Sequence, residues 1–280
     1  VTGGGLGTNH GSATAVFGKK LGFRVVLGLF DQPVTKQVRK NLLLYYTHGA
    51  EMAHVGSLTK AVVRYYVTER IRQRGAYFIA PGGSSPVGTI GYVDAGLELA
   101  MQVERKEIPL PAVIFVAAGT CGTMGGLVLG LRLAGLSTPV MGVQVAPGAF
   151  ANPKAALNLA RKALKVMQRF DRTVPGIELT IHDFPMDRGH YGPGYGHPTD
   201  AGRRAIEFMA ENEKILLDPT YTGKAFGALL DRAKTESGEE KPVLFWNTFN
   251  SVDLSPVTES VDFRSLPEEF HRFFQGDVVV

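Results

Sequence analysis

The sequence predicts an α/β fold in which most strands are parallel. Short apolar runs alternate with stretches of helical periodicity, and most of the loops between them are short. Glycine-rich loops follow several predicted strands, and in parallel sheets such loops meet at the carboxyl edge, where ligands bind. With 280 residues, of which 44% are hydrophobic and 20% charged, the chain is long enough for one large domain or two modest ones.

The individual elements follow from local patterns along the chain. Short β-branched and apolar runs predict strands, whereas apolar residues at helical spacing predict helices. The chain begins at Val1-Thr2, which resembles the end of a strand, so we expect further sequence upstream. The predicted helices are 11–21, 35–48, 58–74, 89–105, 127–133, 153–169, 201–212 and 223–234. The predicted strands are 24–29, 77–79, 113–118, 140–145, 214–217 and 243–246.

Composition argues against several classes of partner. The net charge of +4 is spread along the chain without a Lys/Arg block, which gives nucleic-acid binding little support. No apolar run approaches the ~18–20 residues that a membrane span needs. Cys121 is the single cysteine, so no internal disulfide can form, and we expect a cytoplasmic protein. No His/Cys/Asp spacing suggests a metal site.

The segment Gly119–Gly126 is the most informative part of the chain. It lies between an apolar β-branched run and a helix-like stretch, so free backbone amides and the helix dipole can face an anion there. It lacks the Gly-Lys-Ser/Thr of a Walker A loop and the Gly-x-Gly-x-x-Gly of a dinucleotide fingerprint. Two interpretations remain, a compact phosphate cup or a tight turn that binds nothing.

The first glycine loop, Gly3–His10, also allows two interpretations. Thr8 and Asn9 are good helix N-cap residues. Alternatively, the amides and these side chains face an anionic ligand. The glycine content exceeds what a cap needs, which indicates that the backbone approaches something closely.

Two tyrosines lie in loops with turn residues. Tyr195 falls within Gly192–Pro198, and Tyr221 precedes a predicted helix. Each either packs in the protein or lines a ligand site. Ser84-Ser85 lacks the Gly-x-Ser-x-Gly elbow of a serine hydrolase, and His197 has no partner cluster for a metal.

Taken together, these loops resemble those of fold-type II pyridoxal-phosphate enzymes, in particular the 1-aminocyclopropane-1-carboxylate deaminase/D-cysteine desulfhydrase family. The resemblance covers nearly the whole chain, and its five segments are specific only in combination. It implies a tryptophan synthase beta-like fold of two three-layer α/β domains with mainly parallel sheets. The segments are Gly4–His10, Gly82–Tyr92, Gly119–Gly126, Gly192–Pro198 and Leu217–Ala225.

The resemblance also implies how the domains and partners are organised. We expect an incomplete small α/β domain over 1–95 and a large phosphate-binding α/β domain over 96–280. Pyridoxal 5′-phosphate would lie between them. The substrate would be a small amino acid, and the protein would be a homodimer.

The same resemblance implies roles for the site residues. Asn9 would hydrogen-bond the pyridoxal O3′, and Thr8 would stand in for a family serine near the substrate carboxylate and Cα. Tyr195 and Tyr221 would line the substrate side, where one orients the ring or helps proton transfer. The phosphate would be held by the Thr123 hydroxyl and by the backbone amides of Thr120, Cys121, Gly122 and Thr123.

Thr248 falls where the family places the partner of the pyridine nitrogen. The deaminase branch has a carboxylate there, whereas a neutral threonine is the pattern of the desulfhydrase branch. Thr248 therefore favours α,β-elimination from a cysteine-like amino acid, with cyclopropane ring opening as the alternative. Phe249 and Asn250 replace glycines of the family, so we expect a crowded ring site or a shifted loop.

The lysine that would hold the cofactor as a Schiff base is not visible. In the family it lies one helix upstream of the first glycine loop, in a Lys-x-Arg-Lys context. Here Lys19 and Lys20 are interpreted as surface residues and Lys224 as structural. A non-catalytic ligand-binding protein of the same fold is therefore a second alternative, and we expect little activity from residues 1–280 alone.

Overall fold

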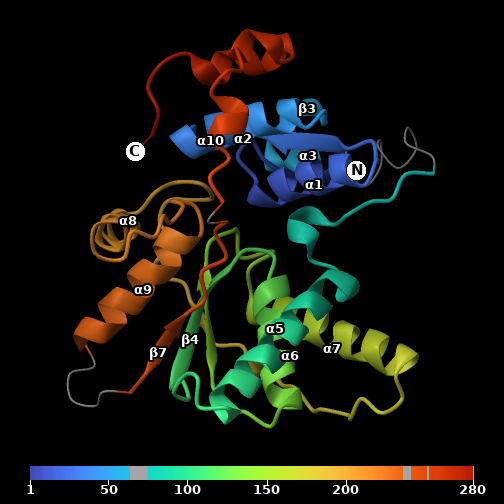
Figure 1. Ribbon diagram of the computed structural model, residues 1–280, viewed down its shortest axis with the longest axis vertical. Coiled ribbons are helices and arrows are strands. Elements are labelled where there is room, and N and C mark those ends of the chain that lie inside the picture. The colour runs from blue at the N-terminus through green and yellow to red at the C-terminus, as the bar shows by residue number, and fades with distance from the viewer. Residues whose placement is uncertain (64–74, 236–240, 251, 280) are drawn as a thin grey trace. The chain divides into compact units, whose positions relative to one another are not determined.

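Two parallel sheets organise the chain in the computed structural model, which describes residues 1–63, 75–235, 241–250 and 252–279. All pairings among the described strands are parallel, which confirms the predicted α/β class (Figure 1). The first sheet has the order β1-β2-β3, with β1 (Thr2–Gly5), β2 (Val26–Phe30) and β3 (Glu51–Gly56). The second has the order β6-β5-β4-β7, with β4 (Val113–Ala118), β5 (Val140–Gln144), β6 (Met186–Asp187) and β7 (Val243–Phe245).

The predicted helices are found at approximately the expected positions, whereas the short helices after residue 250 and the 3-10 helices were not predicted. The prediction over 58–74 begins with α3, and its part beyond residue 63 lies outside the described residues. Within the described part of the chain, no helix has the length and apolar character required to cross a bilayer. The helices are α1 (Asn9–Lys20), α2 (Lys36–Thr47), α3 (Leu58–Val63), α5 (Pro86–Glu104), α6 (Gly122–Leu133), α7 (Pro153–Phe170), α8 (Asp200–Asn212), α9 (Thr222–Thr235) and α10 (Ser255–Thr258), with the short 3-10 helices η2 (Pro81–Gly83), η3 (Ile181–Asp183), η4 (Phe263–Ser265) and η5 (Glu268–Phe274).

The chain forms two compact units whose boundaries differ from the expected division at residue 95. The first unit is Val1–Gly82 together with Asn250–Val280, and the second is Gly83–Phe249. Position 95 lies inside α5, which packs so closely on α6 that a Cβ at Gly96 would lie 3.1 Å from the Cα of Gly130. The segment after residue 249 joins the first unit because its apolar side chains are buried there, beside β2.

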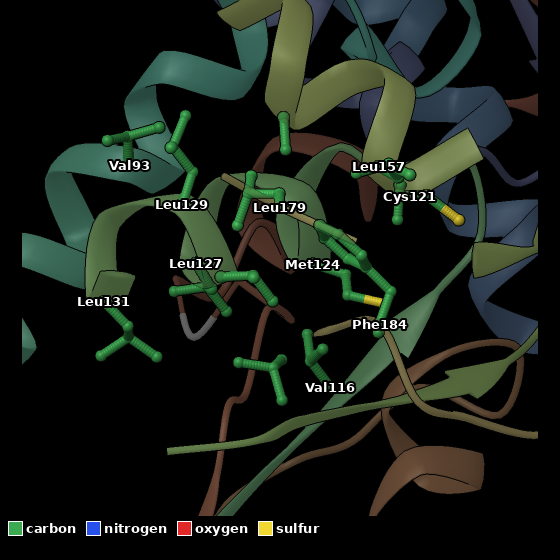
Figure 2. Close-up of a cluster of buried hydrophobic side chains, with 14 of the residues drawn as sticks. Val93, Val116, Cys121, Met124, Leu127, Leu129, Leu131, Leu157, Leu179 and Phe184 are labelled. Carbon is green, nitrogen blue, oxygen red and sulfur yellow. The ribbon is translucent and has the colours of Figure 1, made fainter. Parts of the chain in front are cut away.

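In the second unit, β4 is buried on both faces. Ile114 and Val116 belong to a core cluster with side chains of α5, α6 and α7, while Phe115 packs with side chains of α9. Figure 2 shows Val116 and Met124 within the first of these clusters. This alternation places helices on both faces of the second sheet and produces a three-layer unit.

In the first unit, the glycine run before Thr8 belongs to β1 rather than to the expected loop. A Cβ at Gly3 would lie 3.1 Å from the carbonyl oxygen of Gly28 on β2. A Cβ at Gly4 would lie 2.7 Å from the Cβ of Thr8. The close approach that the glycines indicated is therefore made by the protein itself.

The predicted strand 214–217 is wrong. Lys214 has a φ of 57°, in the left-handed region, and the chain turns there at the end of α8. Ile215 is 41% and Leu216 70% exposed, so these apolar residues have no covering layer, while Leu217 is buried. Residues 214–218 form neither helix nor strand.

Two further differences concern short or polar strands. The strands β3 and β6 were not predicted, because β3 includes Glu51 and His54 and β6 has only two residues. The predicted strand 77–79 is wrong, because these residues form no strand and two backbone hydrogen bonds join them to Val1. Tyr77 accepts a hydrogen bond from the Val1 amino group at 2.9 Å, and Ile79 donates one to the Val1 carbonyl at 2.9 Å.

Candidate functional site

The turn from β4 into α6 leaves a helix N-terminus without a side-chain cap. Cys121 precedes the helix with a φ of 66° and a ψ of 6°, and its side chain accepts no hydrogen bond from the first turn. The first amides of a helix have no intrahelical acceptor, and the helix dipole adds partial positive charge to them. Burial raises the pKa of the Cys121 thiol to about 11, so the thiol stays neutral and does not repel an anion.

The second glycine-rich loop lies directly against this turn. The Ser84 hydroxyl shares a 2.6 Å hydrogen bond with the Thr120 hydroxyl. A Cβ at Gly122 would lie 2.7 Å from the Ser84 Oγ, so only glycine fits there without a shift. The neighbouring Ser85 instead caps α5, because its side chain accepts a hydrogen bond from the amide of Gly88 at 3.0 Å.

The groups at this turn fit a phosphate. The α6 N-terminus combines backbone donors with the half-buried hydroxyls of Thr120, Thr123 and Ser84, and its first turn has no acidic residue. Such a donor set, with a glycine where a Cβ would collide, is suited to an anion that approaches the backbone. The predicted residues Thr120, Cys121, Gly122 and Thr123 are thus consecutive at one helix N-terminus.

The two predicted tyrosines come together in the second unit. Their hydroxyl oxygens are 2.5 Å apart, and their ring centroids are 6.1 Å apart at an interplanar angle of 71°. A Cβ at Gly119 would lie 3.8 Å from Cε1 of Tyr221, so the pair is adjacent to the turn after β4. Burial raises the pKa of Tyr195 to about 12, although the hydrogen bond with Tyr221 opposes this shift.

Thr248 follows β7 at the carboxyl edge of the second sheet. The amide of Trp246 donates to the Phe115 carbonyl at 2.9 Å and extends the pairing with β4 by one residue. The Thr248 side chain is exposed, and Phe249 is half-buried, with its amide bonded to the Asn247 side chain at 3.0 Å. The role of Thr248 as partner of the pyridine nitrogen stays a prediction.

In the first unit, Thr8 is the N-cap of α1, which confirms that interpretation of the first loop. Its hydroxyl accepts from the amide of Gly11 at 3.4 Å, and its carbonyl accepts from the hydroxyl of Tyr45 at 2.8 Å. Thr8 is 5% exposed. Thr8 therefore caps the helix that follows it through its side chain, whereas Cys121 does not.

The orientation of the Asn9 amide follows from its neighbour Asn41. The Nδ2 of Asn41 donates to the Gly7 carbonyl at 2.8 Å, and a carbonyl can only accept. The same Nδ2 also donates to the Oδ1 of Asn9 at 3.1 Å, while Oδ1 of Asn41 accepts from Gln37 at 2.8 Å. The network therefore uses Oδ1 of Asn9 as an acceptor and leaves its Nδ2 as the donating end.

Asn41 was not among the predicted site residues, although the sequence around it carries a recognisable signal. Asn41 is 2% exposed and lies on the apolar face of α2 with Val38, Leu42 and Tyr45. A polar residue at a buried helical position needs a specific hydrogen-bond partner. That requirement could have identified it as part of a polar network.

The lysines behave as predicted. Lys19 and Lys20 are exposed on α1. Lys224 is completely buried, and its Nζ donates to the backbone carbonyls of Tyr191 and Gly194 at 2.7 and 3.4 Å.

Known proteins are similar to this chain in sequence. The profile of a family described as "Pyridoxal-phosphate dependent enzyme" matches residues 4–248. A D-cysteine desulfhydrase of Salmonella newport (strain SL254) is 31% identical over 258 residues, which span 89% of this chain and 75% of the relative. A D-cysteine desulfhydrase of Salmonella paratyphi A is 33% identical over 259 residues, with the same coverage of 89% and 75%.

Solved structures show the same fold. The crystal structure of an ACC deaminase homologue superposes with a TM-score of 0.70 at 30% identity and covers 87% of this chain and 71% of its own. A threonine deaminase from T.th. shares the fold at 18% identity, with a TM-score of 0.57 and coverage of 91% and 78%. The chain belongs to the family of pyridoxal-phosphate-dependent enzymes, has the fold-type II architecture and is a lyase whose cofactor is pyridoxal 5′-phosphate.

Proposed function

We propose that the protein catalyses α,β-elimination from D-cysteine. With the addition of one water, D-cysteine would yield pyruvate, hydrogen sulfide and ammonia. The observation that carries this proposal is Thr248, the neutral residue of the desulfhydrase pattern, three residues after the end of β7. The D-cysteine desulfhydrases that are 31–33% identical over 89% of the chain support the same substrate.

The cofactor phosphate would bind to the backbone amides of Thr120–Thr123 and to the Thr123 hydroxyl. Charge-assisted hydrogen bonds from amides at a helix N-terminus suit this anion. The bound cofactor supplies an electron sink that acidifies the Cα proton of an amino acid. Thr248 would face the pyridine nitrogen as a neutral hydrogen-bond partner.

Asn9 would donate its Nδ2 to the O3′ of the cofactor. The Asn41 network supports this role, because it occupies the Oδ1 of Asn9 and leaves the donor end of the amide for an anionic oxygen. Thr8 would donate its hydroxyl proton to the substrate carboxylate, since its oxygen already accepts from Gly11.

Tyr195 and Tyr221 would hold the proton that moves during elimination. Two hydroxyl oxygens 2.5 Å apart can pass a proton between them. The raised pKa of Tyr195 keeps that hydroxyl protonated at neutral pH. The pair would therefore act as an acid or a proton relay at the leaving sulfur, and not as a standing base.

Ring opening of 1-aminocyclopropane-1-carboxylate is the second candidate. It would yield 2-oxobutyrate and ammonia, and the ACC deaminase homologue with a TM-score of 0.70 at 30% identity favours it. We also propose a cytoplasmic homodimer, for which light scattering after size-exclusion chromatography should give twice the protomer mass.

The test is to incubate the full-length gene product, loaded with cofactor, with D-cysteine, L-cysteine and 1-aminocyclopropane-1-carboxylate separately. We expect equimolar pyruvate and sulfide from D-cysteine. Production of 2-oxobutyrate alone would favour the deaminase, and the absence of any product would contradict both proposed reactions. Tyr221→Phe should lower kcat, whereas Tyr77→Phe is a matched control because Tyr77 is 76% exposed.

A further inference from the structure

Lys224 is unusual because a completely buried lysine carries a large desolvation cost. Among the described residues it is the lysine with 0% exposure, in the first turn of α9. Burial lowers its pKa to about 8, and the negative charge of Asp218 opposes that shift. A buried ammonium group must be satisfied by hydrogen bonds, so the partners of Lys224 indicate its task.

The contacts of Lys224 identify this task. Its Nζ donates to the carbonyls of Tyr191 and Gly194 and lies 5.4 Å from the centroid of the Tyr191 ring. Residues 188–199 form neither helix nor strand, so backbone hydrogen bonds of a sheet or helix do not fix them. Gly194 immediately precedes Tyr195, and Lys224 therefore anchors the backbone from which the Tyr195 ring extends.

Asp218 anchors the other tyrosine in a comparable way. It is 3% exposed, and its Oδ2 accepts from the amides of Thr220 and Tyr221, both at 3.0 Å. Its Oδ1 accepts from the amide of Thr222 at 3.0 Å and from the Thr222 hydroxyl at 2.7 Å. The carboxylate thus fixes the backbone of Tyr221, three residues before Lys224.

We propose that Lys224 and Asp218 are positioning residues that together set the hydroxyl contact between Tyr195 and Tyr221. The ammonium group holds the Tyr195 loop through its carbonyls, and the carboxylate holds the Tyr221 turn through its amides. Neither group touches the reacting atoms. The proposal depends on the proposed function only for the substrate-side role of the tyrosines.

The test measures the tyrosine hydroxyls directly, without cofactor or turnover. Tyrosine labelled with carbon-13 at Cζ reports by NMR whether each hydroxyl proton is hydrogen-bonded and exchanges slowly. Tyr195→Phe and Tyr221→Phe assign the two signals, and Tyr77 is the solvent-exposed reference. The central variant is Lys224→Met, which removes the charge and the donors while retaining a long apolar stem. Lys224→Gln is a second variant with a short polar side chain.

We expect both Lys224 variants to increase hydroxyl exchange of Tyr195 and Tyr221 by about tenfold or more, as loss of one hydrogen bond implies. Lys234→Met, at an exposed position on the same helix, should leave both signals unchanged. Ala228→Gly, which loosens the packing of α9, should lower stability without moving the signals.

Unchanged tyrosine signals in a folded Lys224 variant would overturn the proposal. An equal change in Ala228→Gly would also overturn it, because the effect would then follow from general destabilisation. If both Lys224 variants fail to fold, Asp218→Asn must accelerate Tyr221 exchange more than Lys234→Met does, or the proposal fails. Since no substrate is involved, each of these outcomes is separate from a failure of the elimination assay.

Discussion

Two glycine-rich strand-to-helix turns of this protein look alike in sequence, but only one of them provides a side-chain cap for the helix that follows. Before α1, Thr8 adopts an extended conformation and its side chain accepts from the amide of Gly11. Before α6, Cys121 is left-handed and its side chain caps nothing. The α1 N-terminus therefore has a side-chain cap, whereas the α6 N-terminus has none.

The two helices also differ in how much of each is buried. In α1 only Gly11 and Ala15 are buried, while in α6 the residues from Met124 to Leu131 are buried with Gly122. An open N-terminus costs hydrogen bonds that a side-chain cap would supply. We infer that close packing of α6 compensates for the missing cap.

The largest expected effect comes from disturbing the packing of α6. A Cβ at Gly126 would lie 2.5 Å from the Thr89 carbonyl oxygen and from the Tyr92 Cβ. Gly126→Ala should therefore lower the free energy of unfolding by roughly 2–3 kcal/mol, measured by urea denaturation. Gly18→Ala in α1 is the matched control, since its Cβ would collide only with a methyl group of Val25, which can move. An equal loss of unfolding free energy in both variants would show that α6 is not packed more tightly than α1.

The left-handed residue before α6 offers a second test. Cys121→Val places a β-branched side chain at a φ of 66° and should cost about 2 kcal/mol of unfolding free energy. Cys121→Gly accepts that φ without strain, so its loss should be smaller. If urea denaturation shows Cys121→Gly to be less stable than Cys121→Val, residue 121 does not adopt the left-handed conformation.

The hydrogen bond between Asn41 and Asn9 allows a test of the proposed role of Asn9 at the start of α1. Asn41→Asp replaces the donor that faces Oδ1 of Asn9 with an acceptor, so the Asn9 amide should rotate and present its oxygen outward. We expect affinity for pyridoxine 5′-phosphate to fall about tenfold, as loss of a hydrogen bond to a charged group implies. Calorimetry measures this loss. A smaller effect of Asn41→Asp than of Asn41→Ala would contradict the proposed orientation.

The smallest effect is expected at the cap of α1. Thr8→Ala should lower the free energy of unfolding by about 1 kcal/mol, the usual cost of losing an N-cap. Thr8→Ser keeps the accepting oxygen and should retain most of that stability. Denaturation curves of the two variants that coincide would show that the hydroxyl does not close this helix.

Local patterns in the sequence were sufficient for most elements and for the Thr8 cap. The strand 113–118 was predicted with its observed bounds, and the helix predicted over 89–105 is present but begins three residues earlier, at Pro86. The resemblance also placed Tyr195 and Tyr221 in one site, and the structure joins their hydroxyls.

Features that depend on distant residues were not accessible in this way. The return of the C-terminal segment to the first unit depends on burial of Phe270, which no local pattern indicates. Whether Gly4 lies in a loop or a strand depends on pairing with β2. The carbonyl partners of Lys224 lie about thirty residues earlier in the chain, so only the folded protein reveals its task.

The central claim is that the α6 N-terminus, and not the α1 N-terminus, binds the cofactor phosphate. The most direct measurement compares the dissociation constants of pyridoxine and pyridoxine 5′-phosphate, neither of which can react with a lysine. We expect the phosphate to strengthen binding by about a hundredfold, since several charge-assisted hydrogen bonds contribute. Thr123→Val should reduce this factor by about tenfold, whereas Thr8→Val should leave it unchanged. Equal binding of the two ligands, or an equal reduction in Thr8→Val, would contradict the account.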